Sequence, residues 1–348
     1  MDTESEMSLS PIKVLMLNVC RDGWHSGNMV YDMRAVQQAC DTKTYGPGWP
    51  GYETTSLPEI IKRLYGDDQP DVIYSYFTPN EKVGDVYMQH YKIPENLRYF
   101  PTDFKKVKGP LKIFALSDFW ARKPHQYERD LNGAGFEYCF CCFAPPYSNP
   151  KDFFRFFSPK IREQMKFVGY PRCVDKDCYK DYGLRKTHDV ITVGAMWRFY
   201  PLRMHMHGFL AHHAVDHGII YKNYPHCGTN WSHNGFYRED YAKAINQAKM
   251  LASCGGKYHL AMNKIFEAMG CKTIYVGEEP YGAQELHLED GVNYVAVTKH
   301  NFVEKMEYYL NRPSKMDEIV DNAQKTFLTY HNIQTRAVDF VRLLEGVL

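Results

Sequence analysis

The sequence contains no apolar run of the roughly 20 residues that a membrane-spanning helix requires. Residues 1–10 are polar and acidic, and they lack the basic and apolar regions of a signal peptide. The chain also has almost no net charge, because 42 Lys and Arg against 41 Asp and Glu leave only +1. No overall electrostatic field therefore draws the protein onto nucleic acid or an anionic membrane. We expect a soluble, cytoplasmic protein.

Metal-site spacings are also missing. The ten cysteines are scattered through apolar segments and form no paired, short-spaced pattern of the zinc-finger type. His213 and His217 are one helical turn apart, but no H-E-x-x-H arrangement accompanies them. Buried, reduced thiols are therefore the better interpretation of the cysteines, and no metal site is indicated.

What the sequence does contain is an alternation of strand and helix patterns. A short apolar run at 11–19 opens this alternation, and a second one begins at 189–194, after Gly169 and Pro171 interrupt the pattern at 167–175. At 348 residues the chain exceeds the usual size of one domain, so two domains of roughly 150 to 180 residues are expected. Alternating strands and helices form parallel sheets. The sequence thus predicts an α/β protein with two Rossmann-like domains.

One junction in the second half points to a ligand. Residues 264–277 have the pattern of a helix that ends at Gly270 and leads into a β-branched strand, with Glu267 on the helix. An ionised carboxylate accepts hydrogen bonds from two neighbouring hydroxyls, such as those of a ribose. An ordinary amphipathic helix with a solvated Glu267 explains the same pattern.

This stretch resembles the nucleotide-binding region of group 1 glycosyltransferases of the two-Rossmann-domain type (GT-B), in particular the spore-maturation-protein-like branch. In that family a glutamate in this context binds the ribose hydroxyls of the donor, and Glu267 holds its place. The resemblance implies two Rossmann-like domains that face each other across a cleft. It divides the chain into a flexible N-terminus, an acceptor-binding domain, a linker, a nucleotide-sugar-binding domain and a C-terminal helix that crosses back to the first domain, at 1–10, 11–168, 169–188, 189–332 and 333–348.

Basic residues beside glycines are candidates for binding the donor diphosphate. The strand at 189–194 ends in Gly194, and backbone N–H groups at such a turn, together with guanidinium groups, suit an anion. Arg203 matches the family's diphosphate-contacting position, and Arg198 is a second candidate. Lys257, in a glycine-rich turn, and Lys264, just before Glu267, add cations. Solvated surface side chains are the alternative interpretation for each.

Two further donor candidates lie beside this region. His259 stands eight residues before Glu267, where many family members carry a glutamate that faces the transferred sugar. The chain therefore departs from the family at this position. Glu285 lies near the place where relatives carry a residue that touches the donor.

Polar residues in the first half are candidates for the acceptor side. The loops after parallel strands carry ligands, and Asp118 and His125 follow the apolar run at 111–116. Either residue is a candidate catalytic group that orients or deprotonates the acceptor hydroxyl. Asp22 and His25 compete for this role, and Trp49 offers an aromatic surface for a sugar. Capping of the next helix is the alternative role for Asp118.

The resemblance implies a hexosyltransferase that moves a sugar from a nucleotide sugar, with a UDP-sugar favoured, to a hydroxyl group, with retention of configuration. The acceptor is a glycan, a metabolite or DNA. Transferases of this fold usually need no metal, so we expect no essential metal and no permanently bound cofactor. Three alternatives stay open: a DNA glycosyltransferase that acts on a hydroxymethylated base, a nucleotide-sugar epimerase, and a catalytically inactive nucleotide-sugar-binding protein.

Overall fold

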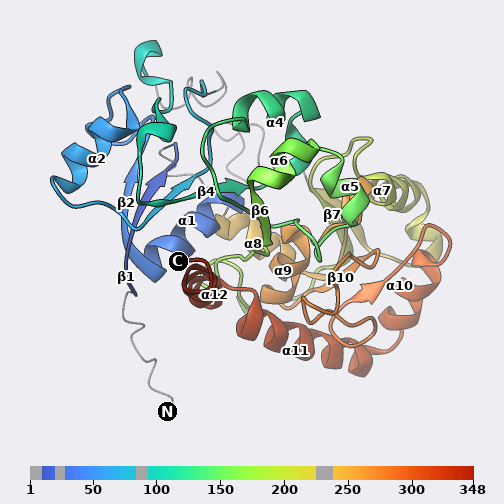
Figure 1. The fold of residues 1–348 in the computed structure, drawn as a ribbon. Coiled ribbons are helices and arrows are strands. Elements are labelled where there is room, and N and C mark those ends of the chain that lie inside the picture. Colours follow the sequence, from blue (N-terminus) through green and yellow to red (C-terminus); the bar gives the residue numbers. More distant parts are fainter. Residues whose placement is uncertain (1–9, 20–27, 84–92, 225–237) are drawn as a thin grey trace.

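The computed structural model describes residues 10–19, 28–83, 93–224 and 238–348. These residues form two separate parallel sheets with helices packed around them (Figure 1). The first sheet has the strand order β2-β1-β3-β4-β5-β6. Its strands are β1 (Ser10–Leu17), β2 (Cys40–Tyr45), β3 (Val72–Ser75), β4 (Leu111–Leu116), β5 (Tyr138–Cys141) and β6 (Lys166–Gly169). The expected α/β class with two Rossmann-like sheets is confirmed.

The second sheet is built from the later part of the chain, in the order β11-β10-β9-β7-β8. Its strands are β7 (His188–Val193), β8 (Tyr221–Tyr224), β9 (Ala248–Ala252), β10 (Ile274–Gly277) and β11 (Val295–Ala296). All of its strand pairs are parallel. Since parallel neighbours end at the same edge of a sheet, the residues after β7, β9 and β10 lie close together.

Helices connect and cover the strands. The α-helices are α1 (Asn28–Ala39), α2 (Leu57–Tyr65), α4 (Pro124–Leu131), α5 (Pro150–Phe154), α6 (Pro159–Gln164), α7 (Pro201–His213), α8 (Arg238–Asn246), α9 (Asn263–Gly270), α10 (Phe302–Leu310), α11 (Pro313–Tyr330) and α12 (Ile333–Glu345). Short 3₁₀ helices occur at η1 (Glu95–Leu97), η2 (Phe104–Lys106), η3 (Phe119–Ala121), η4 (Val215–His217) and η5 (Gly256–Tyr258).

In the first sheet, buried strands are predicted from the sequence pattern, and partly exposed edge strands are not. Residues 14–17 of the interior strand β1 are fully buried, because helices cover both faces of a parallel sheet. The edge strands β2 and β6 are partly exposed, β2 is mostly polar, and neither strand is predicted from the sequence. The segment 167–175, expected as an interruption, therefore begins inside a strand.

The C-terminal helix α12 packs against α1 of the first sheet's layer, as Figure 1 shows. Phe340 on α12 is fully buried, and its ring lies 5.2 Å from the ring of Tyr74 and 6.2 Å from that of Phe140. Burial of one phenylalanine stabilises a fold by about 2 kcal/mol. The helix α12 thus contributes to the core of the first sheet's layer.

Other expectations concern membranes, thiols and metals. In the described ranges, no helix combines the length and the apolar character needed to cross a bilayer. The eight cysteines in these ranges are free thiols, and six of them are buried. His213 and His217 each contact a carboxylate, Asp216 at 3.3 Å and Glu307 at 2.7 Å. Within the same part of the chain, no three His, Cys, Asp or Glu side chains converge as metal ligands do.

Candidate functional site

Three neighbouring strands of the second sheet deliver polar residues or glycine to one edge. Gly194 follows β7, Ser253 follows β9 and Glu278 follows β10. The strands β7 and β10 both pair with β9, so these three residues lie at the same end of the sheet. Ligands of open α/β sheets bind at this carboxyl edge.

Arg203, in the first turn of α7, is buried at this edge with 3% of its surface exposed. Its Nε and Nη2 atoms donate to Ser253 Oγ at 3.2 and 3.0 Å, and Nη1 donates to the carbonyl of Ala195 at 3.1 Å. The guanidinium also stacks on the Tyr200 ring, 4.1 Å from its centre. Among the described residues, no carboxylate lies within ion-pair distance of Arg203. A buried cation without a counter-ion is costly, and an anionic ligand would relieve that cost.

Gly194 allows two cations to approach the backbone turn after β7. Its φ is +112°, in the region that side-chain-bearing residues rarely adopt. A Cβ atom at this position would lie 2.8 Å from Nη1 of Arg203 and 3.7 Å from Cε of Lys264. Because Gly194 has no side chain, Arg203 and Lys264 can both lie close to this backbone turn.

We predict that Gly194→Ala destabilises the protein by about 1–3 kcal/mol, because the new Cβ combines an unfavourable φ with a clash against Arg203. Displacement of Arg203 should also weaken anion binding. Urea denaturation measures the first effect.

Gly208→Ala is the matched control on the same helix as Arg203, since a Cβ there meets nothing within 4 Å. It should stabilise the protein by roughly 0.5–1 kcal/mol. Equal effects of the two substitutions would contradict this account of Gly194.

Glu267 lies on α9 and is 3% exposed. Its Oε2 atom accepts hydrogen bonds from Lys264 Nζ at 2.8 Å and from the Tyr241 hydroxyl at 2.7 Å. Lys264 also lies 4.8 Å from the centre of the Tyr241 ring. Glu267 is therefore a buried, oriented carboxylate and not a solvated one, which excludes the alternative left open by the sequence.

Glu278 directly follows β10 and contacts the backbone at Gly255, two residues after Ser253. The backbone N–H of Gly255 donates to its Oε1 atom at 3.1 Å, and Nδ1 of His259 lies 3.9 Å from the same oxygen. The Oε2 atom is buried and has no hydrogen-bond partner among the described residues. Burial raises the pKa of Glu278 from 4.5 to about 7. His259 has a φ of +49°, which is uncommon for a residue other than glycine.

The raised pKa of Glu278 predicts how stability depends on pH. Between pH 4.5 and about 7 the folded state binds this proton more tightly than the unfolded state does, so stability falls as pH rises through that window. Glu278→Gln removes this contribution. Relative to the variant, the wild type should lose on the order of 2 kcal/mol between about pH 5 and pH 8. Urea denaturation at both pH values checks this, with the exposed Glu279→Gln as control. A wild type and a Glu278→Gln variant with parallel pH profiles would refute it.

The donor candidates from the sequence fall into three groups. Gly194, Arg203, Lys264 and Glu267 come together in one series of contacts. Lys257 and His259 are exposed and lie on or next to η5, and His259 is beside Glu278. The remaining two are not joined to this series by a hydrogen bond among the described residues: Arg198 is exposed, and Glu285 lines a groove of about 1460 Å³ with Tyr147 and Arg336.

Three residues of this cluster are not singled out by the sequence: Tyr241, Ser253 and Glu278. Ser253 and Glu278 follow strands directly, so the rule that ligands bind at the carboxyl ends of parallel strands is a signal that could have found them. No local pattern distinguishes Tyr241, because its hydroxyl reaches Glu267 from a different helix.

Asp118, the catalytic candidate after β4, is held by a buried arginine. Arg172 Nη2 donates to its Oδ1 atom at 2.7 Å, and Arg172 Nη1 lies 3.4 Å from Oδ1 of Asn263, the first residue of α9. The carboxyl side chain of Asp118 makes no hydrogen bond as a helix cap. Arg172 thus connects a loop of the first sheet to the helix that carries Glu267.

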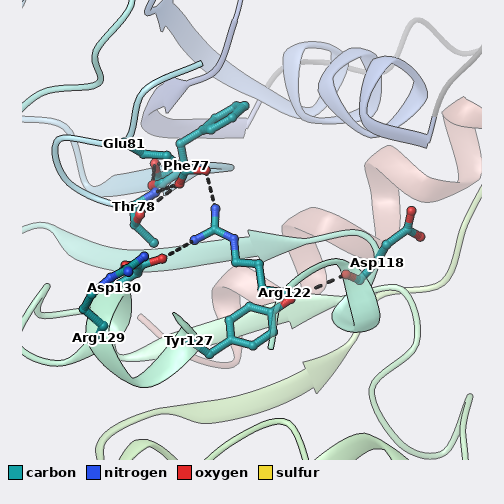
Figure 2. Close-up of polar contacts among 9 residues, drawn as sticks. Phe77, Thr78, Glu81, Asp118, Arg122, Tyr127, Arg129 and Asp130 are labelled. Carbon is teal, nitrogen blue, oxygen red and sulfur yellow. Dashed lines mark hydrogen bonds and ion pairs between the residues drawn. The ribbon is translucent and has the colours of Figure 1, made fainter. Parts of the chain in front are cut away.

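The surrounding loop is fixed by a second arginine, as Figure 2 shows. Arg122 forms ion pairs with Glu81 and with Asp130, the latter at 3.0 Å. The Tyr127 hydroxyl donates to the backbone carbonyl of Asp118 at 3.5 Å, and the Asp118 carboxyl group points away from Arg122 (Figure 2). These contacts leave the Asp118 side chain, 42% exposed, accessible to solvent.

The other acceptor candidates are distributed differently. His125 is exposed on α4 and lines a surface hollow with Arg155, and Asp118 is not part of that lining. Trp49 lies beside the end of β1, where its indole N–H donates to the carbonyl of Asn18 at 3.0 Å. Asp22 and His25 lie outside the described residues. His125 therefore lines a hollow in which Asp118 takes no part.

Comparison with known proteins adds the context of a family. Residues 200–342 match the family described as Glycosyl transferase-like, and this match includes Arg203, Lys264 and Glu267. No curated protein sequence matches the chain significantly.

Several solved structures share the fold. HepE of Anabaena, solved in complex with UDP and glucose, superimposes with a TM-score of 0.57 at 13% identity, covering 96% of this chain and 99% of its own. Sucrose-phosphate synthase of Thermosynechococcus elongatus gives a TM-score of 0.61 at 8% identity, with 97% and 99% covered. A glycosyltransferase of Rickettsia africae gives 0.54 at 10% identity, with 97% and 98% covered.

These findings agree with the resemblance to group 1 GT-B glycosyltransferases found in the sequence. The fold over nearly the whole chain is that of the GT-B glycosyltransferases, and the family match places the glycosyltransferase pattern on the second sheet and its helices. The GT-B fold is thereby confirmed, and the family match over residues 200–342 supports the expected class of enzyme. The narrower resemblance to spore-maturation-protein-like transferases stays a prediction.

Proposed function

We propose that this glycosyltransferase of the GT-B type transfers a sugar from a UDP-sugar to a hydroxyl acceptor. The observation that carries the proposal is the buried Arg203, which has no carboxylate partner in the described ranges and lies next to Gly194 and the Lys264–Glu267 pair. The proposal assigns the donor to residues 189–332 and the acceptor to residues 11–168, with 169–188 as linker and 333–348 as the helix that returns to the first domain.

The chemistry of the cluster suits a nucleoside diphosphate. Arg203 and Lys264 supply cationic donors for the two phosphates, and the turn at Gly194 brings the backbone close to them. Glu267 supplies a carboxylate for the ribose diol, and its bonds to Lys264 and Tyr241 hold it in place. The uridine base is favoured because HepE, which shares the fold, was solved with UDP and with UDP-glucose.

On the acceptor side, Asp118 is the proposed group that orients or deprotonates the attacking hydroxyl. Its carboxylate is partly exposed at the end of β4, and its bond to Arg172 fixes its direction. Retention of configuration is supported by the group 1 resemblance. Transfer to a hydroxymethylated DNA base, epimerisation, and binding without turnover stay as alternatives.

Titration with nucleotide sugars, followed by thermal unfolding, tests the proposal. A ligand that binds only the folded state raises the melting temperature with its concentration. UDP-sugars should stabilise the wild type, and GDP-, ADP- and TDP-sugars should do so less. Product formation with added glycans or hydroxymethylated DNA then identifies the acceptor, and NMR of the product's anomeric proton decides between retention and inversion. Failure of every nucleotide sugar to stabilise the protein would refute the proposal.

A further inference from the structure

Glu278 is a buried carboxyl group with half of its hydrogen bonding unmet. Its side chain is only 12% exposed, and Gly255 satisfies one of its oxygens. The other oxygen, Oε2, is buried and has no partner among the described residues. Buried polar groups in folded proteins nearly always have partners, so an exception at the edge of a ligand site indicates a group that a ligand completes.

The order of charges around Glu278 matches the order of ribose, diphosphate and sugar in a nucleotide sugar. Contacts run from Glu267 to Lys264, from Lys264 past Gly194 to Arg203, and from Arg203 to Ser253. Two residues beyond Ser253, the N–H of Gly255 binds Glu278. The series therefore has a carboxylate at each end and two cations between them. A nucleotide sugar has hydroxyl groups on both sides of its diphosphate, on the ribose and on the sugar.

We infer that Glu278 binds hydroxyl groups of the transferred sugar, with the His259 imidazole beside it, and so takes part in choosing which sugar is transferred. The inference rests on the donor site proposed above. A carboxyl group suits this role because it accepts hydrogen bonds from hydroxyls, and in its protonated form also donates one. Rotation about the last side-chain bond exchanges the two oxygens, so either one can meet a hydroxyl.

The raised pKa of Glu278 is consistent with this role. It follows from the same burial that leaves Oε2 without a partner. A group that changes protonation near neutral pH can serve a hydroxyl both as acceptor and as donor. Arg203, whose charge lowers this pKa, contributes less than burial does.

Isothermal titration of UDP and of a panel of UDP-sugars tests the inference, with Glu278→Gln and Glu278→Ala as variants. Glu279→Gln is the matched control, since Glu279 is the exposed next residue. For the sugar that the wild type binds best, the ratio of the Kd for the UDP-sugar to the Kd for UDP should rise about tenfold in Glu278→Ala. The Kd for UDP itself should change less than about threefold, which also demonstrates that the variant is folded. The control should leave both constants unchanged.

The outcomes separate this inference from the proposed function. A wild type that binds neither UDP nor any UDP-sugar refutes the donor site, and the inference falls with it. A wild type that binds UDP, with Glu278 variants that keep the same Kd ratios and the same preference among sugars, overturns the inference alone. Loss of UDP binding in both variants, with normal thermal unfolding, would also overturn it, because it would place Glu278 at the nucleotide.

Discussion

Arg203→Met should weaken the binding of UDP and of the donor UDP-sugar by roughly 100-fold or more. Hydrogen bonds to charged groups contribute about 1.5–3 kcal/mol each, and a guanidinium that meets a diphosphate makes at least two. Methionine preserves much of the packing against Tyr200 but carries no charge. Isothermal titration with UDP measures the effect.

The same substitution should cost little stability. Arg203 has no carboxylate partner in the described part of the chain, so its removal leaves no unpaired counter-ion behind. We expect the free energy of unfolding to change by no more than about 1 kcal/mol. Arg198→Met is the matched control, because Arg198 is exposed on the same connection between β7 and α7. It should leave UDP binding within about threefold of the wild type. An Arg203→Met protein that binds UDP as the wild type does would remove Arg203 from the donor site.

Glu267→Gln should lose both donor binding and stability. Lys264 is 15% exposed and is paired with Glu267 at 2.8 Å, so the variant leaves a mostly buried ammonium without its carboxylate. Breaking a buried pair in this way costs on the order of 3 kcal/mol. Urea denaturation should therefore distinguish this variant from Arg203→Met, which removes a cation that has no such partner.

The ligand that isolates the role of Glu267 is the 2′-deoxy analogue of UDP. The wild type should bind UDP at least about tenfold more tightly than the analogue, because the carboxylate then lacks one hydroxyl. Glu267→Gln should lose most of this discrimination. Glu285→Gln, in the separate groove beside Tyr147, should retain it in full. Unchanged discrimination in Glu267→Gln would show that the ribose lies elsewhere.

Part of the site could be predicted from the sequence because it is local. Gly194 and Arg203 surround one strand-to-helix turn, and Lys264 and Glu267 are three residues apart on one helix. Their proximity needs only the pitch of a helix and the direction of a parallel strand. The family resemblance then supplies a role for each. Arg198 and Glu285 were chosen by the same reasoning, but in the described residues neither forms a hydrogen bond with the cluster, because a position in a loop does not fix the direction of its side chain.

Contacts between distant segments could not be predicted in this way. Tyr241 reaches Glu267 across 26 positions, and Arg172 reaches Asp118 across 54. Nothing in the local pattern around either residue specifies its partner. The partly exposed strands β2 and β6 also depend on distant segments. Each forms a strand because it pairs with a buried neighbour, and not because of its own apolar pattern.

The sequence by itself determined the α/β class, the restart of the strand–helix alternation at 189–194, and the positions of Glu267 and Arg203. It did so because hydrophobic periodicity and glycine turns act over a few residues. Only the tertiary structure decided that Glu267 is held by Tyr241 and that, among the described residues, Arg203 has no carboxylate partner and one Glu278 oxygen has no hydrogen bond. Burial and charge pairing depend on which distant groups the folded chain brings together, and these properties give the cluster its capacity to bind a nucleotide sugar.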